Sequence, residues 1–275
     1  KKNDVNKISY KGLNIGKYIY QSYCRELLEK TIDIKDKRLL KFISEAITVV
    51  NTVNKITEEK KIKKLFISHT IFIRYGIISK IVSNQNGNVY ILYPVSKNGY
   101  LKDLTLLRTS KELIQQEKYW EFEKNFSKLK NKKYLLRKSK IDLEQRIYKN
   151  QKSLKLMIKN TPYNNKKILD LKNKDKKIKV IILPSCFFDA VGFFRYSLFP
   201  DSYSWVTYLL NVAKKTNHDW YIKSHPDGMI ENESVIKELK MKYPFLNILQ
   251  SDTSNLTFKK NNFTTMFTYQ GSACH

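Results

Sequence analysis

Residues 219–227 read Asp-Trp-Tyr-Ile-Lys-Ser-His-Pro-Asp, an apolar run that passes straight into polar residues and a proline. A short apolar run bounded in this way is typical of a buried strand. Proline restricts the preceding residue to extended geometry, so Pro226 ends the strand and fixes the direction of His225. Lys223 lies two residues earlier and is expected on the same side of the chain. An ammonium and an imidazole at one strand end suit a phosphate group, although a surface histidine before a turn proline fits the pattern as well.

The segments around this strand alternate between strand and helix patterns. Strands are predicted at residues 178–183, 245–249 and 263–269, and helices at residues 201–215 and 231–242, the first capped by Asp201 or Ser202. Such alternation predicts a parallel sheet in an α/β fold. We therefore expect residues 176–275 to form a Rossmann-like domain. The sequence stops directly after the last predicted strand, so this domain is expected to be incomplete.

Residues 1–165 are predicted to form a second α/β domain with lysine-rich helices. Helical spacing of apolar residues marks residues 16–29 and 37–55, and a strand, a helix and a strand follow at residues 64–69, 71–83 and 88–92. The last three predict a right-handed βαβ unit, and His69 ends its first strand, where ligands of open α/β sheets bind. A lysine-rich helical stretch covers residues 109–172, and the polar residues 160–177 are the expected linker.

Composition excludes several protein classes. Of the 275 residues 41% are hydrophobic, which is enough for ordinary cores and excludes a disordered tail. No stretch is apolar for the roughly 18 residues that span a bilayer, and the first residues are not those of a signal peptide, so a cytoplasmic protein is expected. The three cysteines have no metal-ligand spacing and indicate neither a zinc site nor a disulfide framework.

The net charge of +27 is unevenly distributed. Residues 181–275 hold 9 basic and 8 acidic residues, whereas residues 1–180 hold 43 and 17. Codon bias towards lysine explains part of the excess but not the nearly neutral C-terminal part. A basic N-terminal face that meets an anionic membrane or a phosphate-bearing acceptor is the functional alternative.

Two further strand ends carry residues suited to chemistry. After the last predicted strand the chain reads Gln270-Gly271-Ser272-Ala273-Cys274-His275, small residues that would let a phosphate approach backbone amides. After the strand at residues 178–183 it reads Pro-Ser-Cys-Phe-Phe-Asp, in which Asp189 is a base, a hydroxyl ligand or a helix cap. A plain turn would explain either segment.

Taken together, these segments resemble the glycosyltransferases of bacterial capsule and surface-carbohydrate biosynthesis. The resemblance covers roughly residues 178–275 and is carried by four ordered runs: Cys186 to Ala190, Leu198 to Trp205, Trp220 to Pro226 and Thr268 to His275. Weaker likeness lies at Ser68-His69 and at residues 75–77. Ser185 and residues 191–192 depart from the family pattern.

The resemblance implies a GT-B-like arrangement of two Rossmann-like domains with parallel sheets. It implies transfer of a sugar from a CMP-, UDP- or GDP-sugar to a growing polysaccharide or glycolipid, without a metal and without a cofactor other than the nucleotide-sugar. The expected donor-binding residues are Lys223, His225, Pro226, Gly271, Ser272 and His275. Asp189 and His69 are the expected catalytic residues, because one of them could activate the acceptor hydroxyl.

Two other functions remain open. A non-catalytic partner in polysaccharide assembly would keep the fold and lose the catalysis, as the departures near Cys186 allow. A nucleic-acid-binding protein is suggested by the aromatics between lysines in residues 109–150. No recognised nucleic-acid motif supports it, and we expect no nucleic acid among the partners. Contact with the inner face of a membrane through the basic N-terminal part is the further expectation.

Overall fold

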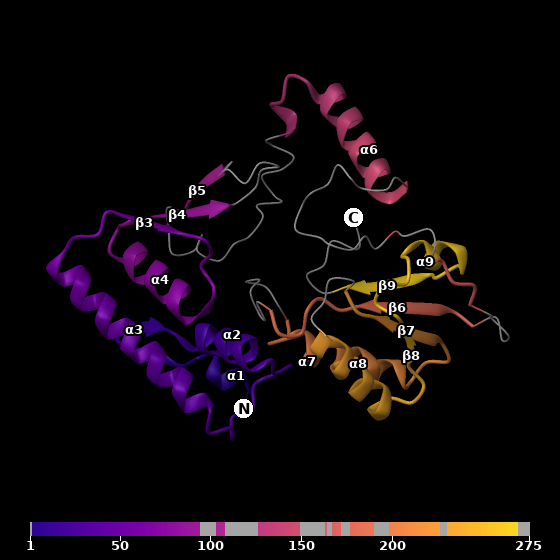
Figure 1. The fold of residues 1–275 in the computed structure, drawn as a ribbon, viewed down its shortest axis with the longest axis horizontal. Helices are drawn as coiled ribbons and strands as arrows, with labels where there is room; N and C mark the ends of the chain where they lie inside the picture. Colours follow the sequence, from indigo (N-terminus) through magenta and orange to yellow (C-terminus); the bar gives the residue numbers. More distant parts are fainter. Residues whose placement is uncertain are drawn as a thin grey trace.

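The computed structural model describes residues 2–93, 103–107, 126–148, 163, 167–171, 177–189, 198–225 and 230–268. They form an α/β protein with one group of elements from the N-terminal part and one from the C-terminal part (Figure 1). The helix α6 (Lys132–Tyr148) belongs to neither group in this view. The predicted α/β class is confirmed.

The C-terminal group is built on a four-stranded parallel sheet. Its strands are β6 (Lys179–Leu183), β7 (Asp219–Lys223), β8 (Asn247–Leu249) and β9 (Thr265–Thr268). In space they follow the order β8-β7-β6-β9, so the chain starts in the middle, moves to one side and then returns to the other. This is the strand order of a Rossmann-like half, and it places a reversal of direction between β6 and β9.

Helices cover both faces of this sheet. The helices α7 (Ser202–Ala213) and α8 (Ile230–Lys242) lie on one face, and α9 (Leu256–Lys260) lies on the other (Figure 1). Alternation along the strands explains the two cores: Ile182 and Ile222 pack against α7 and α8, whereas Ile181 and Tyr221 pack with Phe258 of α9. A parallel sheet buried on both faces needs such apolar strands.

Residues 167–171 run along the α9 face of the sheet and are attached to its core by Leu171. Leu171 packs there, its backbone N–H donates to Asn261 Oδ1 at 2.6 Å, and Leu169 N–H donates to Thr257 Oγ1 at 3.1 Å. This part of the expected linker is thus fixed to the C-terminal group. Lys179, which is buried, reinforces it by donating to the carbonyls of Leu171 and Asn261.

The N-terminal group combines helices with a small mixed sheet. It contains α1 (Lys2–Val5), the short hairpin β1 (Ser9–Tyr10) and β2 (Leu13–Asn14), and the helices α2 (Gly16–Leu27) and α3 (Leu39–Glu59). Its sheet comprises β3 (Lys64–Ile67), β4 (Asn88–Tyr93) and β5 (Asp103–Leu107). The connection from β3 to β4 runs through the π-helix η1 (Phe72–Gly76) and α4 (Ile77–Asn84).

The expected βαβ unit is confirmed, because β3 and β4 are parallel. The expectation of a wholly parallel sheet in this half is wrong: β5 pairs antiparallel with β4. No element was predicted for Asp103 to Leu107. Five residues without clear turn signals give too little pattern to predict an edge strand.

Candidate functional site

The carboxyl edge of the C-terminal sheet is the natural place for a ligand. In open α/β sheets ligands bind beyond the carboxyl ends of the strands, at the point where the strand order reverses. Here that point lies between β6 and β9. The structure describes the residues that follow β6, β7 and β8 at this edge, whereas residues 269–275 lie outside the described part of the chain.

Lys223 ends β7 and is the most unusual residue of this edge. Its side chain is 2% exposed, and its Nζ donates a 3.0 Å hydrogen bond to Asn255 Oδ1, just before α9. Burial lowers the pKa of Lys223 from 10.5 to about 8, and the charge of Asp252 opposes this shift. An ammonium has three donors, and one neutral amide is a weak counterpart for a buried charge. The site therefore favours the arrival of an anion.

The two residues after Lys223 face different surroundings. Ser224 is buried and donates a 2.5 Å hydrogen bond to Glu233 Oε1 in the first turn of α8. His225 is exposed. Because β7 ends at Lys223, the strand alternation that predicted Lys223 and His225 on one side does not extend to His225. His225 remains at the same sheet edge, but at its surface.

The segment after β6 is anchored by its two aromatic residues. Phe187 and Phe188 are at most 1% exposed and belong to the core beneath α7 and α8. Asn232 of α8 holds the same segment, accepting from Phe187 N–H at 3.0 Å and donating to Cys186 Sγ at 3.6 Å. Core packing therefore accounts for the two phenylalanines of the run Cys186 to Ala190.

Asp189 leaves this core and reaches the N-terminal group. It is exposed and forms an ion pair with Arg25 of α2, with 3.7 Å between Oδ1 and the guanidinium. Both side chains are about half exposed, so the pair contributes little to stability. Residues 190–197, which follow Asp189, lie outside the described part of the chain. Asp201 caps α7, as predicted: its Oδ1 accepts a hydrogen bond from Ser204 N–H at 2.5 Å.

Asp201 also binds two residues of the N-terminal group. Its carboxylate is fully buried, and its Oδ2 accepts hydrogen bonds from Tyr20 at 2.5 Å and from Thr31 at 2.6 Å. Burial raises the pKa of Tyr20, and the negative charge of Asp201 raises it further. The phenol therefore stays protonated and donates the hydrogen bond. The positive end of α7 is therefore occupied by a side-chain carboxylate that other residues hold in place.

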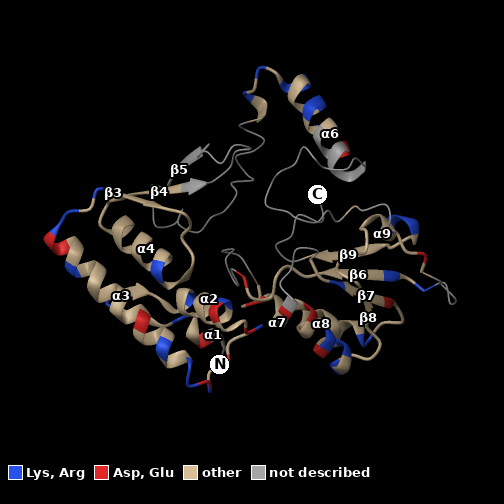
Figure 2. Cartoon of the chain, viewed as in Figure 1, with Lys and Arg blue, Asp and Glu red and all other residues tan. Residues whose placement is uncertain are grey.

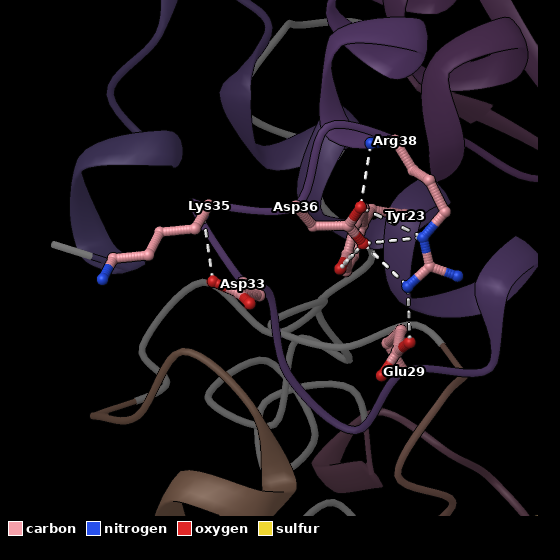
Figure 3. Close-up of polar contacts among 6 residues, drawn as sticks. All are labelled: Tyr23, Glu29, Asp33, Lys35, Asp36 and Arg38. Atoms are coloured by element: carbon pink, nitrogen blue, oxygen red, sulfur yellow. Dashed lines mark hydrogen bonds and ion pairs between the residues drawn. The ribbon is translucent and has the colours of Figure 1, made fainter.

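A polar cluster fixes the loop that carries Thr31. Figure 3 shows Arg38 bridging the carboxylates of Asp36 and Glu29, while Tyr23 donates to Asp36 at 2.7 Å. Arg38, and after it Tyr23, lowers the pKa of Asp36 to about 2. The loop between α2 and α3 is thus tied at both ends, which positions Thr31 toward Asp201.

Lys30 makes a second contact from this loop. Its ammonium pairs with Glu238 of α8 and lies 4.9 Å from the ring centroid of Tyr203. Tyr203 in turn donates to Glu238 at 3.0 Å. Tyr20, Lys30 and Thr31 could not be predicted as contact residues, because side-chain contacts between segments so far apart leave no local pattern in the sequence.

His69 lies in the N-terminal group, at the end of β3 as predicted. Its ring makes edge contacts with Phe72 at 5.6 Å and with Tyr75 at 4.2 Å between centroids. Its Nδ1 is buried and has no hydrogen-bond partner. The π-helix that follows begins with Phe72 at φ 64°, a conformation that bulky residues rarely adopt. No contact in the described residues joins His69 to Asp189 or Lys223.

Pro226, Gly271, Ser272 and His275 lie outside the described residues. Within the described part, no group of three or more His, Cys, Asp or Glu side chains is suited to hold a metal ion. No helix of that part is long and apolar enough to cross a bilayer.

Comparisons with protein families, with curated proteins and with solved structures found no match for this chain. The strand order and the residues at the sheet edge therefore carry the functional argument. The likeness to surface-polysaccharide glycosyltransferases stays a prediction from the sequence.

Proposed function

We propose that this protein is a glycosyltransferase that moves a sugar from a nucleotide-activated donor to a surface polysaccharide or glycolipid. The donor is a CMP-, UDP- or GDP-sugar, and its phosphate binds at the carboxyl edge of the C-terminal sheet, next to Lys223. The observation that carries the proposal is a buried ammonium with one neutral partner at the ligand-binding edge of a Rossmann-like sheet.

The helix ends at this edge support a lysine-based phosphate site. Rossmann-like proteins that bind dinucleotides place the pyrophosphate at the first helix N-terminus, behind a glycine-rich turn. Here Asp201 fills that position on α7, and residues 184–201 contain a single glycine. Glu231 and Glu233 in the first turn of α8 repel an anion there as well. With both helix starts unsuited to an anion, Lys223 is the positive group that we propose for the phosphate at this edge.

The leaving group of the reaction explains why a cation is needed. When the sugar–phosphate bond breaks, negative charge grows on the nucleotide phosphate. An ammonium already positioned in a site of low polarity stabilises that charge. His225 and, beyond the described residues, Ser272 complete the proposed donor contacts, and no metal or other cofactor is required in this scheme.

The acceptor hydroxyl needs a base, for which Asp189 and His69 are the two proposed groups. Asp189 is the favoured one, because it follows β6 at the same edge as Lys223, whereas His69 follows β3. The ion pair between Asp189 and Arg25 also supports the second proposal, a non-catalytic partner in polysaccharide assembly. In that case the carboxylate serves a contact inside the protein and not a reaction. Turnover separates the two proposals.

The test uses the intact chain and a panel of radiolabelled CMP-, UDP- and GDP-sugars. We expect one donor class to raise the melting temperature and to be hydrolysed or transferred. Asp189→Asn is expected to abolish turnover and keep the thermal shift, while His225→Ala weakens the shift itself. A thermal shift without turnover supports the non-catalytic partner, and no shift with any nucleotide contradicts both.

A further inference from the structure

The helix α6 presents an exposed surface outside both sheets and outside the proposed donor site. The hydrophobic core clusters of the described residues contain no α6 side chain. Tyr134 is 65% exposed, Leu136 57% and Ile141 43%. Figure 1 shows α6 standing away from both sheets.

Basic side chains dominate the same helix and the residues just before it. The exposed ones are Lys128, Lys130, Lys133, Arg137, Lys138 and Lys140. No acidic residue occurs between residues 126 and 141. Figure 2 shows this concentration of Lys and Arg along α6.

One side of α6 combines both properties. Tyr134, Arg137, Lys138 and Ile141 follow the spacing of three, four and seven residues, which places them on one helix face, and all four are exposed. This set of four residues is called the α6 face. Its two charges lie between two apolar side chains.

The charge of α6 is also unfavourable for the helix itself. Its first turn holds Lys132 and Lys133 and no acidic residue, although the start of a helix carries partial positive charge. A nearby negative surface would relieve this repulsion. The helix is therefore better suited to an anionic partner than to water.

We propose that the α6 face binds the surface of an anionic lipid bilayer. Arg137 and Lys138 would lie among the phosphate headgroups, with their aliphatic stems along the apolar boundary, and Tyr134 and Ile141 would insert shallowly. The aliphatic Ile141 favours lipid over nucleic acid, where bases stack on aromatic rings. The proposal concerns another part of the molecule and does not depend on the donor site.

The experiment is sedimentation of the intact protein with phosphatidylcholine vesicles and with mixed phosphatidylcholine–phosphatidylglycerol vesicles. We expect binding to the mixed vesicles alone, weakened by salt. The variant R137E/K138E should bind at least roughly thirtyfold more weakly, because each basic residue near the surface contributes about 1 kcal/mol and the two new carboxylates are repelled by the anionic headgroups. The variant K41E/K55E makes the same charge change at exposed residues of α3 and should lose less than about threefold.

A second variant separates insertion from charge. Y134S/I141S keeps all charges and should lower binding several-fold even in raised salt, with an unchanged circular dichroism spectrum. Equal losses in R137E/K138E and K41E/K55E overturn the proposal, since the attraction would then belong to the whole protein. Binding of poly(U) without binding of vesicles overturns it in favour of a nucleic acid.

Discussion

The phenol of Tyr20 on α2 donates a 2.5 Å hydrogen bond to the carboxylate of Asp201, which caps α7 181 residues further along the chain. Both residues are at most 1% exposed. One carboxylate therefore caps a helix of the C-terminal group and accepts a hydrogen bond from the N-terminal group. Folding of α7 and contact between the two groups are coupled in this way.

Removal of the Tyr20 hydroxyl should destabilise the protein. Tyr20→Phe is expected to lower the free energy of unfolding by about 1.5–3 kcal/mol, the usual contribution of a buried hydrogen bond to a charged acceptor. Denaturant titration measures it. Tyr10→Phe is the matched control, because Tyr10 donates to Asn51 at an exposed position and its loss should cost less than about 0.5 kcal/mol. Equal effects of the two variants would contradict a special role for Tyr20.

The coupling between the two residues should itself be measurable. Asp201→Asn keeps an oxygen for the cap but loses the charge, and we expect it to be at least as destabilising as Tyr20→Phe. The double variant should be less destabilised than the two single effects added together, with a coupling energy of about 1–3 kcal/mol in a double-mutant cycle. Strict additivity would mean that the short contact contributes nothing of its own.

Lys223→Met should separate stability from binding. The lowered pKa of Lys223 corresponds to a cost of about 3 kcal/mol for the buried charge, of which the hydrogen bond to Asn255 offsets a part. We therefore expect the free energy of unfolding at neutral pH to stay unchanged or to rise by up to about 2 kcal/mol. Lys179→Met is the control, since buried Lys179 donates to two carbonyls and its loss should destabilise. A marked loss of stability in Lys223→Met would indicate that Lys223 is structural.

The same residue predicts a pH dependence of stability. The pKa of Lys223 is about 8 in the folded protein and near 10.5 when unfolded, so between these values the unfolded chain holds a proton that the native protein has released. Stability relative to Lys223→Met should therefore rise as the pH increases from about 8 to about 10.5. Denaturant midpoints of both proteins across this range test it. A parallel course of the two curves would contradict the lowered pKa.

Much of the C-terminal fold could be predicted because its strands are strongly apolar. Val180, Ile181 and Ile182 are buried on both faces of the sheet and form a continuous apolar run, and Asp201 stands where a cap is needed. The strand order was not predictable, because it depends on the face of the sheet over which each connecting helix passes. In the N-terminal half, β5 gave no usable pattern.

The candidate site was harder to predict because alternation stops where a strand stops. Lys223 was placed correctly at the sheet edge, but its burial and its bond to Asn255 depend on the loop after β8, far away in sequence. His225 follows the last residue of β7, and its side can no longer be read from a period of two. The partners of Asp189 and Asp201 come from α2 and the loop after it, and no local signal announces them.

Calorimetric titration of the intact protein with CMP-, UDP- and GDP-sugars tests whether a donor phosphate binds next to Lys223. We predict that one of these donor classes binds, that Lys223→Met abolishes the binding while the protein stays folded, and that folded Lys179→Met still binds. Unchanged affinity in Lys223→Met, or no heat of binding with any of the donors, would contradict a phosphate site at this sheet edge.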